Sequence, residues 1–316
     1  MIFSKVAKDE ILSVERSMDA LFALLSGEIL SAGSLVINKK QITFEMNSEN
    51  QNFLNCVKAQ ICRCFRANEN DVDVSLVSKN KYSLKLSQEL GPKILDELNI
   101  VRIDPKGNFL INRIPTGEIL QDEECLKSYL AGAFVGSGSV STPNRDGGGY
   151  HMEWVCQTEE KADFICNSLA ELNIISIKVE RNGTSIAYIK GSDDICQALA
   201  LIGATKAMLK IESNLVERAV RNNINRQSNC QSANLDKTLV ASAKEINAIN
   251  IIEETIGLDS LKESLRDVAI IRKENPQASL SEIANMLGNK ITRAAISLKL
   301  KQIIKIAETL GGDNGE

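Results

Sequence analysis

An internal repeat with an offset of 105 residues restricts how this chain can fold. The segment LLSGEILSAGSLVI, residues 24–37, is similar to YLAGAFVGSGSVST, residues 129–142. Three aligned pairs share the offset: Gly27 with Gly132, Gly33 with Gly138, and Ser34 with Ser139. Similarity at a fixed spacing indicates that one supersecondary unit occurs twice. We therefore expect a domain at residues 1–205 that contains two repeats, at about 15–100 and 124–205.

The segments that follow each copy also correspond. After the first copy, QITFEM, VDVSLV and KYSLKLS read as strands, and a helix is predicted at about residues 49–65. After the second copy, YHMEWVC, ISIKVE and TSIAYIK read as strands, with a hairpin turn at RNGT and a helix at about 159–172. Each half is thus predicted to run helix–strand–strand–helix–strand–strand–helix. The fold class is α+β with a pseudo-twofold axis.

Small residues recur four apart in each copy, as Gly27 with Ser31 and Gly132 with Gly136. Residues at this spacing lie on one face of a helix, and small side chains there allow two helix backbones to approach closely. The alternative is that each helix simply ends at a glycine cap. Because the spacing occurs in both copies, we favour two helices packed across the pseudo-twofold axis.

The two copies resemble the LAGLIDADG motif of homing endonucleases. In that family the two motif helices form the central interface, and four-stranded sheets extend from it as a saddle over DNA. The last acid of each motif binds the metal ion that activates water. That position is Ala32 in the first copy and Ser137 in the second, and the preceding acid position is Leu30 and Val135. Since neither alanine nor serine offers a carboxylate ligand, the resemblance implies a scaffold with no catalytic residue, no metal ion and no cofactor.

Other residues could in principle replace the missing acids. Glu28 lies one turn before Ala32, and Glu45 and Glu153 lie in the strands that follow the motifs. We expect Glu28 to be a solvated or interfacial helix residue. His151 is the single histidine of the chain. Because no partner motif accompanies it, we expect His151 to pack or to contact a surface and not to catalyse a reaction.

Composition limits the class of protein further. A chain of 316 residues is long enough for two or three domains. The net charge is −4, so a nucleic acid would have to meet a local basic surface. Eight cysteines form no Cys-x-x-Cys pair and only one histidine exists, which argues against a zinc finger. The charged start MIFSKVAKDE and the lack of a long apolar run predict a cytoplasmic protein without membrane contact.

The sequence changes character after residue 205. Residues 206–232 are predicted to form a connecting helix that fades into a linker near Asn222 to Ser232, where asparagine is frequent. Residues 233–310 are predicted to be helical, with turns near Gly257, at NPQA and at LGNKIT.

The last of these turns separates two short helices. Ser279 and Glu282 form the spacing of a capping box, and Thr292 can cap the helix that follows. Ala295, Ile296, Leu300 and Ile303 are expected to face the core of the domain. This layout predicts a helix-turn-helix whose second helix enters the major groove of double-stranded DNA.

The charge of the second helix supports this prediction. Five basic residues and no acid lie between residues 290 and 305. A concentrated basic surface is what phosphate binding requires, although a solvated basic helix face is a common alternative. The predicted DNA-contacting residues are Ser279, Lys290, Thr292, Arg293, Ser297, Lys299, Lys301 and Lys305.

Both parts together resemble the WhiA family of bacterial regulators. The C-terminal resemblance rests on NCQSANLDKT and on IGLDSLKESLRDVAIIRKENPQASLSEIANML. It implies a non-catalytic, nucleoid-associated DNA-binding protein that regulates transcription. In that family the regulated processes are sporulation, or cell division and chromosome segregation. It also implies that the catalytic acids are lost.

Two other interpretations stay open. In one, the chain is a nuclease with a displaced metal site, which Ala32 and Ser137 argue against. In the other, the saddle binds a protein, such as a component of the transcription machinery or a division protein, and only the small domain holds DNA. The saddle strands VINKKQITFEM and ISIKVERNGT carry Glu45 and Glu180 beside their basic residues. They are less basic than a tight DNA groove requires, which keeps the second interpretation open.

Overall fold

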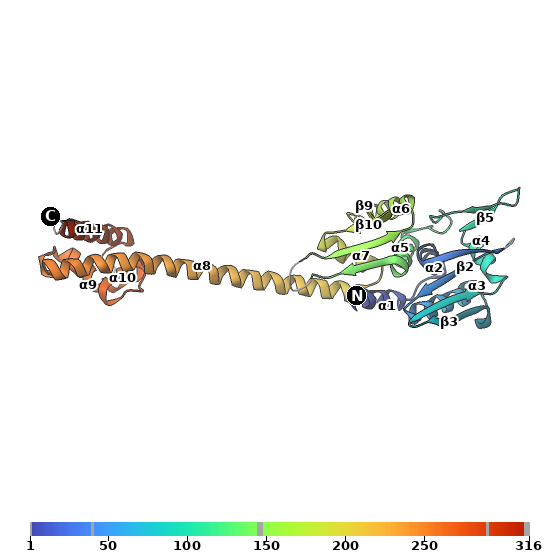
Figure 1. The fold of residues 1–316 in the computed structure, drawn as a ribbon, viewed down its shortest axis with the longest axis horizontal. Coiled ribbons are helices and arrows are strands. Elements are labelled where there is room, and N and C mark those ends of the chain that lie inside the picture. Colours follow the sequence, from blue (N-terminus) through green and yellow to red (C-terminus); the bar gives the residue numbers. More distant parts are fainter. Residues whose placement is uncertain (1, 39–40, 144–147, 289–290, 313–316) are drawn as a thin grey trace. The chain divides into compact units, whose positions relative to one another are not determined.

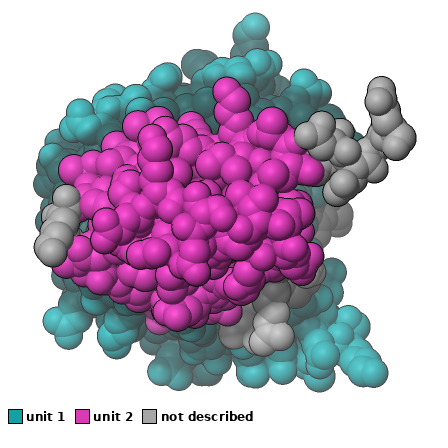
Figure 2. Space-filling model, turned by 90° about the vertical axis from the view of Figure 1, so that its left-hand side faces the viewer, with its two compact units in different colours: residues 1–216 teal, residues 217–316 magenta. Residues whose placement is uncertain are grey.

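The computed structural model describes residues 2–38, 41–143, 148–288 and 291–312. The chain divides into two compact units, residues 1–216 and 217–316, which we call unit 1 and unit 2 (Figure 2). Unit 1 contains the two repeats, and the described part of unit 2 is helical. No helix within the described ranges is both long enough and apolar enough to cross a membrane.

The two repeats have the predicted order of elements (Figure 1). The first consists of α2 (Met18–Ala32), β1 (Gly33–Asn38), β2 (Gln41–Ser48), α3 (Gln51–Phe65), β3 (Val72–Ser78), β4 (Lys81–Leu86) and α4 (Leu90–Glu97). The second consists of α5 (Glu123–Ser137), β7 (Gly138–Ser141), β8 (His151–Cys156), α6 (Glu159–Glu171), β9 (Ile177–Arg181), β10 (Thr184–Ile189) and α7 (Ser192–Leu201). The predicted α+β fold of two related halves is confirmed.

Each repeat forms a four-stranded antiparallel sheet. The strand orders are β1-β2-β4-β3 and β7-β8-β10-β9, so the two sheets share one topology. Every second residue of a central strand is buried: Ile42, Phe44 and Met46 in β2, and Met152, Trp154 and Cys156 in β8. This period of two places one face of each sheet in the apolar core. Residues of α3 and α6 belong to the same core.

Helices α2 and α5 pack on each other at very short range. A Cβ atom at Gly132 would lie 1.9 Å from the carbonyl oxygen of Leu24, and a Cβ atom at Gly27 would lie 2.3 Å from the carbonyl oxygen of Tyr129. Because both distances are well inside van der Waals contact, only glycine fits at these two positions without a backbone shift. One turn later, a Cβ atom at Gly136 would lie 2.9 Å from the Cβ atom of Ser31. Ser31 and the three glycines thus line one contact between the helices.

Both interface helices also end at a glycine. Gly33 is the C-cap of α2 and Gly138 is the C-cap of α5, and both have extended backbone angles. Each cap N–H donates a hydrogen bond to a helix carbonyl, that of Ile29 and that of Phe134. The two sequence interpretations of these segments are therefore compatible, since they apply to different glycines.

Unit 1 has further elements that the repeat pattern does not predict. They are α1 (Ile2–Leu12), the short helix η1 (Glu69–Asp71), and the hairpin of β5 (Val101–Ile103) and β6 (Phe109–Ile111). Helix α1 buries Ala7 and Ile11 in the core. The Glu10 carboxylate accepts hydrogen bonds from the backbone N–H groups of Lys206 and Ala207, at 2.7 and 3.1 Å. Glu10 thereby satisfies free donors in the first turn of the next long helix.

That helix, α8, extends without interruption from Thr205 to Thr255. The predicted linker near Asn222 to Ser232 is therefore wrong, because those residues are helical. The physical reason is that α8 contains neither glycine nor proline, so no residue in it breaks the hydrogen-bonding pattern. Frequent asparagine lowers helix propensity but does not end a helix by itself. The division between the units, after residue 216, falls inside the segment expected to connect the two domains.

Unit 2 continues with η2 (Leu258–Ser260), α9 (Glu263–Glu274), α10 (Leu280–Met286) and α11 (Arg293–Gly312). Its separate apolar core includes residues of α8, α9, α10 and α11: Ile249, Ile252, Val268, Ala269, Ile283, Ile296, Leu300 and Ile303. This core fixes the position of α11 relative to α9 and α10.

Candidate nucleic-acid interface

The capping box at the start of α10 is formed. The Ser279 hydroxyl oxygen accepts a hydrogen bond from the Glu282 N–H at 3.3 Å, and the Glu282 carboxylate accepts one from the Ser279 N–H at 2.7 Å. Hydrogen bonds from the Ser279 backbone N–H and then from its side chain hold the pKa of the Glu282 carboxyl below its usual value. The box fixes where the first helix of the motif begins.

The turn between α10 and α11 includes Gly288, whose φ of 70° is in the left-handed region that favours glycine. Lys290, one of the predicted DNA contacts, lies outside the described residues. Thr292 accepts a hydrogen bond from the Ala295 N–H at 3.3 Å, which is the expected cap of α11. The start of α11 is thus fixed by a side-chain contact.

Helix α11 has one buried face and one exposed face. Ile296, Leu300 and Ile303 are buried as expected, while Ala295 is only half-buried. Among the predicted contacts on α11, Arg293, Lys301 and Lys305 are exposed and Ser297 is half-buried. A basic, solvent-facing surface therefore extends along α11 from its first residue.

The predicted contacts on α11 do not form one flat row. Residues four apart on a helix differ by about 40° in direction, so Lys305 points about 120° away from Arg293. Lys305 instead lines a hollow of unit 2 together with Lys262 and Gln302. Lys299 donates a hydrogen bond to the Ser264 carbonyl oxygen, at the start of α9, at 3.0 Å. Three predicted contacts on α11 point in similar directions from the helix axis and are not bound to another element: Arg293, Ser297 and Lys301.

Sequence reasoning missed a buried ion pair that supports the motif. The Arg272 guanidinium of α9 is 1 % exposed and donates to the Glu245 carboxylate of α8 at 2.6 Å. It also donates to the Ala278 carbonyl oxygen, and the Ser242 hydroxyl donates to the Pro276 carbonyl oxygen. These bonds hold the segment that leads into α10. Arg272 and Glu245 are 27 residues apart in the sequence, so no local pattern indicates the pair.

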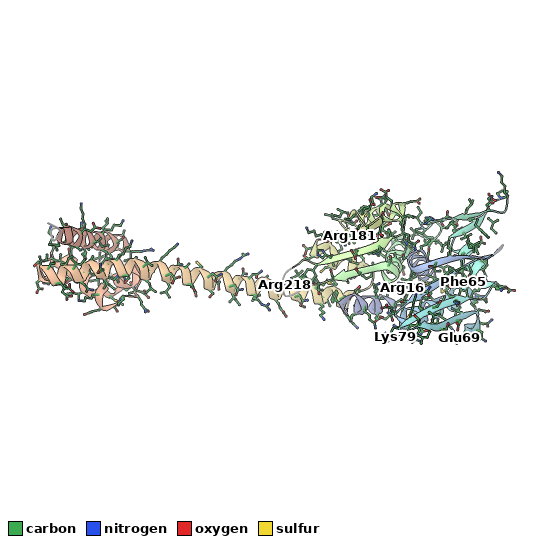
Figure 3. The ribbon with its side chains drawn as sticks, viewed as in Figure 1. Arg16, Phe65, Glu69, Lys79, Arg181 and Arg218 are labelled. Carbon is green, nitrogen blue, oxygen red and sulfur yellow. The ribbon has the colours of Figure 1, made fainter. Side chains whose placement is uncertain are left out.

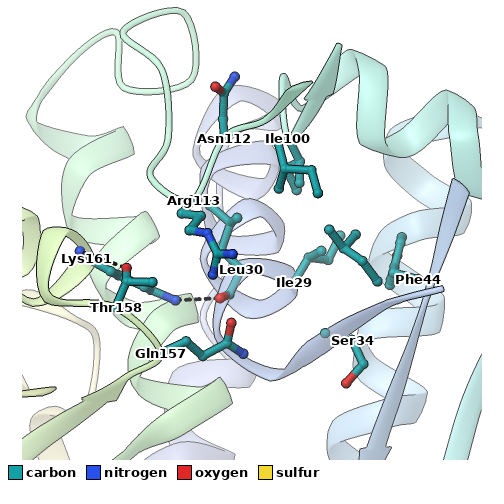
Figure 4. Close-up of a pocket in the computed structure, with 13 residues that line it drawn as sticks. Ile29, Leu30, Ser34, Phe44, Ile100, Asn112, Arg113, Gln157, Thr158 and Lys161 are labelled. Carbon is teal, nitrogen blue, oxygen red and sulfur yellow. Dashed lines mark hydrogen bonds between the residues drawn. The ribbon is translucent and has the colours of Figure 1, made fainter. Parts of the chain in front are cut away.

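The positions of the missing acids lie at the ends of α2 and α5. Ala32 offers no polar side chain, and the Ser137 hydroxyl donates to the Ala133 carbonyl oxygen of its own helix at 3.4 Å. A lysine approaches the end of α2. The Lys161 ammonium donates to the Leu30 carbonyl oxygen at 2.6 Å (Figure 4). It also donates to the Ser31 hydroxyl at 2.8 Å. Across the described ranges, no group of three or more His, Cys, Asp or Glu side chains is placed to hold a metal ion.

The acids that could have replaced the lost ligands have other surroundings. Glu28 is fully buried within the packed helices, so it is an interfacial residue and not a solvated one. Burial raises the pKa of its carboxyl to about 8, against smaller opposing effects of Gln60 and Arg16. Glu153 accepts a hydrogen bond from the Ser139 hydroxyl at 3.1 Å and pairs with Arg181. Glu45 is half-buried in β2.

His151 packs against Tyr188. The two rings are stacked with centroids 5.6 Å apart, and the Tyr188 hydroxyl is hydrogen-bonded to His151 Nδ1. The expectation that His151 packs within the sheet agrees with this contact, since β8 and β10 are neighbours. All eight cysteines are free thiols.

Cations of the second sheet are already paired with acids. Lys178 in β9 lies 2.7 Å from both Glu159 and Asp163, which raises the pKa of its ammonium. Arg181, which is labelled in Figure 3, lies at the end of β9. It pairs with Glu153 at 3.4 Å. A phosphate would have to compete with these acids. The second sheet is therefore a weaker candidate for DNA binding than α11.

Fold and site together define a protein that joins a LAGLIDADG-like double repeat to a helix-turn-helix domain. The model of the WhiA LAGLIDADG-like domain matches residues 21–102 and 126–221, and the model of the WhiA C-terminal HTH domain matches residues 224–307. The chain belongs to the WhiA family. The recognition made from the repeat and from the C-terminal motifs is thus confirmed.

Individual relatives match along the whole chain. A protein of Clostridium botulinum named "Probable cell division protein WhiA" is 33% identical, over 98% of this chain and 99% of that protein. A protein of the same name from Clostridium tetani is 32% identical, over 98% of each chain. The crystal structure of full-length DUF199/WhiA from Thermatoga maritima superposes with a TM-score of 0.56 and 28% identity, covering 97% of this chain and 98% of that one.

Proposed function

We propose that this protein is a non-catalytic regulator of transcription that binds double-stranded DNA through α11. The observation that carries the proposal is the set of solvent-facing polar side chains on α11 that begins at Arg293 in the first helical turn and continues with Ser297 and Lys301, while Ile296 and Leu300 are buried in the core of unit 2. In a helix-turn-helix, residues at the N-terminal end of the second helix contact base edges. Arg293 and Ser297 occupy that end, and Lys301 follows them at a position suited to phosphate.

The proposed role in the cell follows from the relatives. Because proteins that match along the whole chain carry the name of a cell division protein, we assign this chain to the control of cell division. The regulated processes are cell division and chromosome segregation, or else sporulation, and the protein is associated with the nucleoid in the cytoplasm. The partner is double-stranded DNA, and the transcription machinery or a division protein would be a second partner.

The proposed lack of catalysis rests on the ends of α2 and α5. Ala32 and Ser137 supply no carboxylate where related enzymes bind a metal ion, and the Lys161 ammonium lies at the end of α2. This positively charged ammonium would repel a divalent metal ion at the same place. The chain then keeps the scaffold of a nuclease and uses it for another purpose.

Genome-wide mapping of bound DNA in the native host tests this proposal. We expect enrichment at a limited set of promoter-proximal sites, and we expect the Arg293→Ala variant to lose that enrichment at an unchanged protein level. The matched control is Lys93→Ala, which removes one exposed cation from α4 in unit 1. Uniform coverage of the chromosome, or identical maps for Arg293→Ala and the wild type, would rule out α11 as the recognition helix.

A second candidate function is a protein-binding role for unit 1. The paired state of Lys178 and Arg181 favours it, since these cations of the second sheet are neutralised by neighbouring acids. A protein-binding role and a DNA-binding role of unit 1 can be told apart. If unit 1 binds a protein, DNA affinity depends on α11 alone. A strong loss of DNA affinity in Lys79→Ala or Lys81→Ala, at the turn between β3 and β4, would contradict the protein-binding role.

A further inference from the structure

A pocket of about 390 Å³ lies beside the end of α2. We call it the α2-end pocket. The first repeat supplies Leu35 of β1 and Phe44 of β2, the second repeat supplies Gln157 and Lys161, and the β5–β6 hairpin supplies Ile111 (Figure 4). Three parts of unit 1 that are distant in the sequence therefore meet in one cavity. Its size is within the range of about 300–1,000 Å³ that small-molecule sites occupy.

The pocket has an apolar side and a cationic side. Leu35, Phe44 and Ile111 belong to the apolar side. Lys161 and Arg113 supply the positive charge, and none of the described residues that line the pocket is an aspartate or a glutamate. This concentration of one sign of charge occurs in a chain whose net charge is −4. A cavity with apolar walls and two converging cations is complementary to an apolar molecule that carries an anionic group.

The cations are placed to receive a ligand. Among the described residues, Arg113 has no hydrogen-bond or ion-pair partner, and Figure 4 shows its guanidinium directed toward the same end of the pocket as Leu30. Lys161 is 2 % exposed, and its ammonium uses two of three N–H groups on Leu30 and Ser31. One donor of a buried, fixed cation is left for a further acceptor. Such a preorganised donor loses little entropy when it binds an anion.

The backbone adds to the positive potential. Thr158, which lines the pocket, is the N-cap of α6. Its hydroxyl oxygen accepts a hydrogen bond from the backbone N–H of Lys161 at 3.3 Å. The N-terminus of a helix carries a partial positive charge that favours anions. Burial also lowers the pKa of the Lys161 ammonium to about 8, and a bound anion would stabilise its charged form. The two cations and the backbone of the helix end thus favour an anion, and the two acids in the first turn of α6, Glu159 and Glu160, are not among the residues that line the pocket.

We propose that the α2-end pocket binds a small molecule with an apolar body and an anionic head group, a carboxylate or a phosphate. The head group lies between Arg113 and Lys161, and the body lies against Leu35, Phe44 and Ile111. Because the pocket walls come from both repeats, the bound molecule bridges them. Occupancy therefore stabilises unit 1, independently of whether α11 binds DNA.

Fluorescence titration of the full chain with 8-anilinonaphthalene-1-sulfonate tests the proposal, since this probe joins an aromatic body to one anionic group. We expect one saturable site and a higher melting temperature of unit 1. Arg113→Ala should weaken binding by about tenfold or more, because it removes a charge-assisted contact. The matched control is Lys106→Ala, which removes an exposed cation from the same hairpin without touching the pocket. N-phenyl-1-naphthylamine, which lacks the sulfonate, should bind at least about tenfold more weakly.

Two further arms complete the test. Leu35→Trp should fill the pocket and abolish binding, and an unchanged circular dichroism spectrum will show that the variant is folded. Competition with 1-naphthoate and with 1-naphthyl phosphate identifies the head group, and displacement by either one supports the proposal. Non-saturable binding, equal affinity of Arg113→Ala and the wild type, or equal affinity for the neutral probe would overturn it.

Discussion

Replacing Gly132 with alanine should separate α2 from α5. A Cβ atom at this position would lie 1.9 Å from the Leu24 carbonyl oxygen and 3.1 Å from the Glu28 backbone nitrogen. An ordinary contact needs about 3.5 Å, so the backbones must move apart by more than 1 Å along part of their length. Overpacking of this kind costs about 1–3 kcal/mol, and backbone atoms cannot turn aside as a side chain can.

The sign of the effect makes the test sharp. In an exposed helix, changing glycine to alanine stabilises the protein by about 0.5–1 kcal/mol, because alanine has the higher helix propensity. At Gly132 the overpacking outweighs this gain, and we expect a net loss of about 1–2 kcal/mol in the free energy of unfolding of unit 1. Gly132→Leu should lose more. The matched control is Gly117→Ala, where the new Cβ atom would have no neighbour within 4 Å.

The single tryptophan provides the assay. Trp154 is fully buried in unit 1, beside Phe134 of α5, so its fluorescence during urea unfolding reports on unit 1 alone. We expect a lower urea midpoint for Gly132→Ala with an unchanged slope, and no lower midpoint for Gly117→Ala. If Gly132→Ala is as stable as Gly117→Ala, or more stable than the wild type, then α2 and α5 do not meet at this face.

Three other predictions concern charge and catalysis. The folded state raises the pKa of the Glu28 carboxyl to about 8, so Glu28 adds stability below its ordinary pKa of 4.5, and this contribution is lost as the pH rises to 8. Between these values the free energy of unfolding should fall by up to about 1.4 kcal/mol per pH unit. Unfolding experiments from pH 5 to 8 should show that Glu28→Gln lacks this part of the pH dependence. Arg272→Met leaves Glu245 buried without its partner and should destabilise unit 2 by about 3–5 kcal/mol. Hydrogen exchange in α9 should then be faster. The control is Arg266→Met, which removes an exposed pair with Asp259 and should change the stability of unit 2 little. The purified protein should not cleave DNA with Mg²⁺ or Mn²⁺, because Ala32 and Ser137 supply no metal ligand; cleavage that persists after rigorous removal of contaminating nucleases would contradict this.

Much of unit 1 is predictable from the sequence because its pattern occurs twice. Gly27 and Gly132 alone would each fit a helix of many kinds, but their shared offset indicates two helices in equivalent positions. Period-two patterns then predict the strands, and the hairpin turn RNGT predicts the β9–β10 connection, where Gly183 has a φ of 73°. The same holds for α10, whose capping box depends on residues only three apart.

Long-range contacts are not predictable in this way. Lys161 reaches the Leu30 carbonyl oxygen across 131 residues of sequence, and neither segment signals the other. Glu10 caps a helix that begins almost 200 residues later, at Thr205. The continuity of α8 differs from the sequence prediction for another reason. Low helix propensity near Asn222 to Ser232 does not break the helix, because α8 contains no glycine or proline.

DNA affinity measured across a salt series, on mapped sites and on scrambled duplexes, addresses the role of α11. We predict that Arg293→Ala costs about 1–3 kcal/mol on the mapped site and relaxes specificity at one base pair. Lys301→Ala, further along the helix, should weaken binding equally on all sequences and reduce the salt slope by about 1. Lys93→Ala, on α4 of unit 1, should bind like the wild type. If Arg293→Ala and Lys301→Ala also bind like the wild type, the basic side of α11 is only solvated, and another surface must hold the DNA.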